Sequence, residues 1–171
     1  INDRPCAFRY PRGTGLGSLL PPIDEKIKIG KSKIIQEGKK LAILNFGARL
    51  NETLKASENL KKRGVKITIV DARFAKPLDE NLIWQLATTH EAIITIEEGS
   101  IGGFGSHVVD FLTKKGLMDS NLKFRSLTLP DLFIDQDTPD NMYKIANLDS
   151  SSIEEKVLDV LNSNIVLQKQ K

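Results

Sequence analysis

Residues 41–46 read Leu-Ala-Ile-Leu-Asn-Phe, and residues 92–96 read Ala-Ile-Ile-Thr-Ile. Both runs are almost continuously apolar, which is typical of strands that are buried on both faces of a sheet. Such strands occur in parallel sheets, where crossover helices cover the two faces. These two runs therefore predict an α/β fold with a mainly parallel sheet.

The rest of the chain alternates between strand and helix patterns, as that fold requires. From residue 41, the expected order is strand 41–46, helix 49–63, strand 65–70, helix 79–89, strand 92–96, helix 105–115, strand 124–128, and helices 139–147 and 151–162. Gly64 and Gly116 end the first and third helices. Asp79 is the predicted N-cap of the second helix, and one of Ser150 to Ser152 that of the last.

An antiparallel pair is expected at one edge of the sheet. Residues 33–36 and 41–46 flank Glu37-Gly38-Lys39-Lys40, which is hairpin-like spacing with a glycine free to take positive φ. The predicted architecture is a three-layer α/β domain with a mainly parallel sheet, an antiparallel edge hairpin and helices on both faces.

Length and charge limit the classes of function. With 171 residues, 40% of them hydrophobic, the chain can bury one core of ordinary size. A net charge of +3 without a sustained basic stripe argues against a nucleic-acid partner. No apolar run reaches the length of a membrane span, and no signal-peptide pattern opens the chain, so we expect a cytoplasmic protein with no membrane partner. The single Cys6 excludes an internal disulfide and is expected to pack.

Binding or catalytic residues are expected at the carboxyl ends of the strands, where ligands of open parallel sheets bind. Four segments follow strands there: residues 45–47, 71–74, 97–105 and 129–131. The glycines at 102, 103 and 105 match neither a dinucleotide fingerprint nor a P-loop, so tight loop packing is favoured over anion binding. Adjacent Glu97 and Glu98 point to opposite sides of an extended chain, which favours helix capping or an interchain salt bridge over an acid/base pair.

Two sets of possible metal ligands, one of histidines and one of aspartates, lack the features that a metal site needs. His90 and His107 have no carboxylate or cysteine at ligand spacing. Asp131, Asp135 and Asp137 alternate as in a calcium loop, but the residues between them are hydrophobic and the required glycine is absent.

The first 24 residues differ from the rest of the chain. They hold four of the seven prolines, which is typical of turns and linkers, around one strand-like run at 7–10. Arg12 stands between Pro11 and Gly13, an arrangement that can present a guanidinium to a phosphate. From these residues alone, two interpretations of Arg12 are equally good: an arginine that binds phosphate, or a surface arginine on a linker.

Several segments together resemble 1-deoxy-D-xylulose-5-phosphate synthase, a thiamine-diphosphate enzyme family of the transketolase group. The resemblance covers nearly the whole chain and corresponds to that family's carboxy-terminal end. The segments that carry it are Phe8-Arg9-Tyr10-Pro11-Arg12-Gly13, residues 40–47, Asp71-Ala72-Arg73-Phe74-Ala75-Lys76-Pro77-Leu78-Asp79, Ile96-Glu97-Glu98-Gly99 and Leu129-Pro130-Asp131.

The resemblance implies a domain organisation. Residues 1–20 would be the end of a pyrimidine-binding domain, 21–30 a linker, 31–162 a transketolase-type C-terminal domain, and 163–171 a frayed tail. The complete enzyme would be a cytoplasmic homodimer that uses thiamine diphosphate and magnesium. It would condense pyruvate with glyceraldehyde 3-phosphate, with loss of carbon dioxide, in isoprenoid and thiamine biosynthesis.

The resemblance assigns one site residue, Arg12, which corresponds to the arginine that binds the substrate's phosphate. The family's catalytic, cofactor and magnesium residues belong upstream, so none of them maps onto this chain, which is expected to be an inactive fragment that works with the rest of the same polypeptide. Two departures are Thr14 after Gly13 and Asp137 in place of a common glycine. The alternatives are a free-standing interaction or oligomerisation module, and the equivalent domain of a 2-oxoacid dehydrogenase β subunit.

Overall fold

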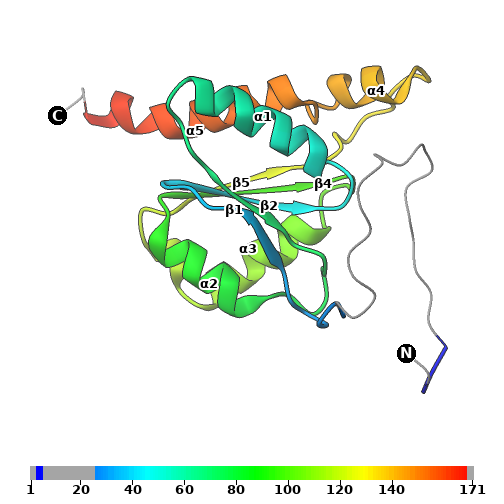
Figure 1. The fold of residues 1–171 in the computed structure, drawn as a ribbon, viewed down its shortest axis with the longest axis vertical. Coiled ribbons are helices and arrows are strands. Elements are labelled where there is room, and N and C mark those ends of the chain that lie inside the picture. Colours follow the sequence, from blue (N-terminus) through cyan, green and yellow to red (C-terminus); the bar gives the residue numbers. More distant parts are fainter. Residues whose placement is uncertain (1–2, 6–25, 169–171) are drawn as a thin grey trace.

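The computed structural model describes residues 3–5 and 26–168, with side chains described up to residue 162. Five strands and their helices follow one another along the chain (Figure 1). In order they are β1 (Lys33–Gln36), β2 (Leu41–Phe46), α1 (Leu50–Lys62), β3 (Thr68–Asp71), α2 (Glu80–Thr89), β4 (Ala92–Glu97), α3 (Phe104–Lys114), the 3-10 helix η1 (Leu117–Asp119), β5 (Lys123–Leu127), α4 (Pro139–Ile145) and α5 (Ser150–Gln168).

The sheet has the order β1-β3-β2-β4-β5. All neighbouring strands are parallel except the edge pair of β1 and β3. Helices α1 and α5 cover one face of the sheet, and α2 and α3 cover the other (Figure 1). The predicted three-layer α/β architecture is therefore confirmed.

The central strands contribute to a core on each face. In β2, Leu41 and Ile43 pack under α1 and α5, whereas Ala42 and Leu44 pack under α2 and α3. All four side chains are buried, because successive residues of a strand point to opposite faces and both faces here are covered. This is the physical reason for the continuous apolar run that predicted the fold.

The hairpin expected from residues 33–46 is wrong in its pairing. Strand β1 lies at the edge as predicted, but it pairs with β3 and not with β2. The connection crosses the neighbouring chain at Gly38, where a Cβ would lie 2.2 Å from the carbonyl carbon of Ile67. Glycine is needed there for this close approach, while the positive φ of the turn falls on Lys40. Strand β2 already pairs with β3 on one side and with β4 on the other, so β1 pairs with the free edge of β3.

The N-cap of α2 is the residue predicted from the sequence, whereas that of α5 is not. Asp79 caps α2 by accepting from the Leu82 amide at 3.4 Å, and it also accepts from Lys31 Nζ at 3.1 Å. The last helix begins at Ser150. The residue before its first residue is therefore Asp149, not one of the three serines that were predicted as the N-cap. The Asp149 carboxylate accepts from the hydroxyls of Ser151 and Ser152. This helix also continues to Gln168, beyond the expected end at 162.

The carboxyl ends of the four parallel strands lie together at one edge of the sheet, which we call the carboxyl edge. Strand β1 is antiparallel, and Lys33 pairs with Asp71 there. The described chain therefore enters the domain at this edge. In the described part of the chain, no helix has the length and apolar character needed to cross a membrane.

Candidate functional site

The chain reverses direction across the sheet between β2 and β4. From β2 it passes to β3 on one side, and then returns beyond β2 to β4 on the other. In open parallel sheets such a reversal leaves a crevice at the carboxyl ends of the two strands, where ligands bind. Residues 47–49 and 97–99 meet at this point, so they form the candidate site.

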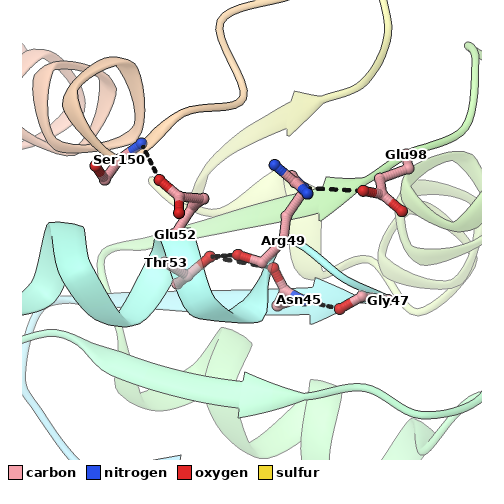
Figure 2. Close-up of polar contacts among 7 residues, drawn as sticks. All are labelled: Asn45, Gly47, Arg49, Glu52, Thr53, Glu98 and Ser150. Carbon is pink, nitrogen blue, oxygen red and sulfur yellow. Dashed lines mark hydrogen bonds and ion pairs between the residues drawn. The ribbon is translucent and has the colours of Figure 1, made fainter. Parts of the chain in front are cut away.

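Asn45 fixes the turn that leaves β2. This asparagine is fully buried, donates from Nδ2 to the Gly47 carbonyl at 2.9 Å, and accepts from Thr53 Oγ1 at 3.1 Å (Figure 2). Gly47 has a φ of +98°, a conformation that side-chain-bearing residues rarely adopt. The polar residue in an otherwise apolar strand therefore ties the loop to the first turn of α1.

Arg49 lies at the start of α1 and points across the crevice. Its Nε donates to Glu98 Oε1 at 2.9 Å (Figure 2), and its guanidinium carbon lies 3.5 Å from the centre of the Tyr143 ring. The Arg49 and Glu98 side chains are 15% and 28% exposed. Burial and the neighbouring Glu98 carboxylate raise the pKa of Tyr143. Glu98, for which an interchain salt bridge was one of the two predictions, pairs with Arg49 of the same chain, and a contact with another chain stays a prediction.

Glu97 caps the next helix, as one of the two favoured readings predicted. Its carboxylate is buried and accepts from the amides of Phe104 at 2.9 Å and Gly105 at 2.8 Å. A carboxylate at this position also interacts favourably with the helix dipole. A Cβ on Gly103 would lie 2.2 Å from Glu97 Oε2, so that glycine is required by the cap. Close packing therefore explains the glycine at position 103, and Glu97 has a structural role as a helix cap.

The sequence of this domain matches a known family. The family model described as "Transketolase, C-terminal domain" matches residues 30–153. This chain belongs to the transketolase C-terminal domain family.

Two solved structures are similar to this transketolase C-terminal domain. One is titled "Split gene transketolase, inactive beta4 tetramer"; it is 25% identical with a TM-score of 0.74, and the match covers 85% of this chain and 46% of that one. The other is the transketolase from Campylobacter jejuni subsp. jejuni NCTC 11168, 14% identical with a TM-score of 0.57, covering 82% and 20% respectively. The chain therefore spans less than half the length of either protein.

Transketolases use thiamine diphosphate with a divalent metal ion, but the described residues of this domain do not fit that cofactor. Among residues 3–5 and 26–168, no group of three His, Cys, Asp or Glu side chains is placed to hold a metal ion. The buried carboxylate of Glu97 already accepts two amides. No cofactor-binding role is assigned to these residues.

Arg73 follows β3 at the same edge and has a strained backbone. Its φ is +59°, which is uncommon for a residue with a side chain and is often found at functional sites. The Asp71 carboxylate accepts from the Arg73 amide at 3.2 Å and lies 3.4 Å from its Nε. The Arg73 side chain is 24% exposed, so this guanidinium is held at the carboxyl edge with a face open to solvent.

Residues 45–47 and 97–99 belong to the segments predicted from the sequence, whereas Arg49 and Tyr143 do not. Arg49 is two residues beyond the segment that was singled out, and Tyr143 is distant in sequence, so no local pattern joins them. The described residues also leave Arg12 and Cys6 outside the structure, because residues 6–25 are not among them. The phosphate-binding role of Arg12 stays a prediction.

Asp137 and His107 take part in local structure. The Asp137 carboxylate accepts from the Thr138 amide at 2.6 Å and from Asn141 Nδ2 at 3.0 Å, at the start of α4. The Asp137 carboxylate therefore stabilises the turn into this helix. His107 lies in the first turns of α3, whose Val108 and Phe111 are buried.

His90 lies at the opposite end of the sheet from the candidate site. Its Nε2 is 2.8 Å from Thr68 Oγ1, and its Nδ1 is 2.9 Å from Thr89 Oγ1. Burial lowers the pKa of His90 from its ordinary value of 6.5. Both ring nitrogens are engaged by hydroxyls, so this histidine fastens α2 to β3.

The lowered pKa of His90 predicts a pH-dependent contribution to stability. Below pH 6.5 the unfolded chain binds a proton that the folded chain binds less readily, so stability falls as the pH falls through that value. We expect urea titrations between pH 8 and pH 5 to show a steeper loss of unfolding free energy in the native chain than in His90→Gln. Parallel curves for the two proteins would contradict this assignment.

Proposed function

We propose that this domain is the carboxy-terminal part of a thiamine-diphosphate-dependent transferase of the 1-deoxy-D-xylulose-5-phosphate synthase type. The complete enzyme joins pyruvate to glyceraldehyde 3-phosphate and releases carbon dioxide. The observation that carries the proposal is the arm Arg9-Tyr10-Pro11-Arg12-Gly13, which precedes in the sequence a transketolase-type C-terminal domain matched from residue 30. Its Arg12 supplies the group that holds the substrate's phosphate.

The architecture supports a role beside an active site. The described chain enters the domain at the carboxyl edge, because β1 begins there. Strand β1 therefore begins on the same side as the loops after β2, β3 and β4. Arg73 and Arg49 also lie at this edge, and both are paired with carboxylates of the same chain.

Replacing Arg12 tests the phosphate role. In the complete enzyme, Arg12→Ala is expected to raise the KM for glyceraldehyde 3-phosphate about thirtyfold, because a hydrogen bond to a charged group contributes about 2 kcal/mol. The KM for pyruvate, which has no phosphate, should change less than about threefold. Steady-state kinetics with each substrate varied in turn measure both values.

Arg9→Ala is the matched control, since it removes the other arginine of the same arm. It should leave the KM for glyceraldehyde 3-phosphate near the native value. If Arg12→Ala raised the KM for both substrates equally, Arg12 would have no special role at the phosphate. Turnover without release of carbon dioxide from pyruvate would instead place the enzyme with another member of the transketolase group.

A second candidate is a separate subunit that acts by assembling with other chains. It is favoured by the similar split-gene transketolase, whose title describes an inactive tetramer of β chains. The complete-enzyme proposal predicts no carboligase activity from the purified 171-residue chain by itself. Activity that appeared only after a separately made chain was added would favour the subunit.

A further inference from the structure

Residues 128–149 join β5 to α5 and cross the carboxyl edge beside the candidate site. Both ends of this connection are fixed. The Leu129 amide donates to the Gly99 carbonyl at 2.9 Å, and Ala146 and Leu148 are buried in the core under α5. Between these anchors lie residues 130–145, including α4, which we call the strap.

The strap itself contributes little to the core. None of its side chains is buried, and α4 has no buried residue. Ile134 and Tyr143 are half-buried and pack against the core of the α1 and α5 face. Leu132 and Phe133 are 58% and 104% exposed. A segment with so few buried contacts belongs to the low-stability end of the structure, where local opening occurs.

Arg49 and Tyr143 form a contact between the strap and the rest of the domain. The guanidinium carbon of Arg49 lies 3.5 Å from the centre of the Tyr143 ring, and Arg49 Nε donates to Glu98 Oε1 at 2.9 Å. The Glu98 carboxylate also interacts with the Tyr143 side chain, and the Leu148 amide donates to the Tyr143 carbonyl at 2.9 Å. Figure 2 shows Arg49 reaching from the start of α1 toward Glu98 at the end of β4. The residue that holds the strap is thus also the residue that spans the crevice.

We propose that the strap is a two-state lid, closed by the stacking of Arg49 on Tyr143. In the closed state Ile134 and Tyr143 cover part of the apolar core surface on the α1 and α5 face. In the open state that surface and the carboxyl ends of β4 and β5 become accessible. Because Arg49 both spans the crevice and carries the stack, loss of the stack shifts the strap toward the open state.

Hydrogen exchange of the 171-residue chain, followed by mass spectrometry, tests this inference without any partner or turnover. Peptides covering residues 130–145 are expected to exchange faster than peptides from the middle of α1. Tyr143→Leu keeps an apolar side chain but removes the ring, so it should accelerate strap exchange about threefold to thirtyfold. Arg49→Gln should have the same effect by removing the other partner.

Arg63→Gln is the matched control, because Arg63 lies at the opposite end of α1 and pairs at 2.9 Å with Glu154 of α5. It should leave strap exchange unchanged. The proposal is overturned if the strap exchanges as slowly as α1, or if the Arg49 and Tyr143 variants leave it unaltered. It is also overturned if their acceleration extends equally to α1, β4 and α3, since that would show global destabilisation and no separate lid.

Discussion

Glu97→Ala is expected to lower the free energy of unfolding by about 3 kcal/mol, because the change leaves two amides at the start of α3 without their charged acceptor. Glu97 Oε2 accepts from Phe104 and Oε1 from Gly105, and both bonds are buried. Neither amide has an intrahelical partner, since they belong to the first turn. Urea unfolding followed by circular dichroism measures the loss.

Two further variants separate capping from a general effect of removing a carboxylate. Glu97→Gln keeps one acceptor oxygen but turns a donor toward the second amide, so it should lose about half as much stability. Glu80→Ala removes a glutamate from the exposed first turn of α2 and should change stability by less than about 0.5 kcal/mol. Equal effects of Glu97→Ala and Glu80→Ala would contradict the buried cap.

Gly103→Ala is expected to cost about 2 to 3 kcal/mol, although alanine is the smallest possible addition. The new Cβ would lie 2.2 Å from Glu97 Oε2 and 2.8 Å from its Cδ. The carboxylate cannot move aside without breaking its bonds to the two amides. The cost should therefore depend on the presence of the Glu97 carboxylate.

A double-mutant cycle tests that dependence. In the Glu97→Ala background the carboxylate is gone, so Gly103→Ala should cost less than about 1 kcal/mol. Ser100→Ala, an exposed change in the same loop, serves as the control and should be additive with Glu97→Ala. If the two main substitutions were additive as well, the tight contact between Gly103 and Glu97 would not be the source of the cost.

These predictions concern the loop that forms one wall of the candidate site. Glu97 and Glu98 are adjacent, yet one carboxylate fixes the start of α3 and the other holds Arg49. A change in the Glu97 cap should therefore also disturb the position of Glu98. The carboxyl edge is ordered by polar groups that the sequence places next to each other but that act on different helices.

The sequence by itself determined the layers of this domain and the edge at which the candidate site was expected. Continuous apolar runs in β2 and β4 can be satisfied only by burial on both faces, and alternation with helices then makes the strands parallel. Asp79 as a cap, and Glu97 as one of two favoured readings, followed from local helix-start chemistry. These features depend on a few neighbouring residues, so a local pattern is enough to predict them.

Only the tertiary structure decided which strands and side chains meet. The edge strand pairs with β3 because Gly38 lets the chain cross Ile67, and no hairpin spacing indicates that crossing. Arg49, Glu98 and Tyr143 come from three separate elements and meet only after the sheet has formed. Contacts between residues distant in the chain carry no local signal, because their free energy is gained only when the whole fold brings them together.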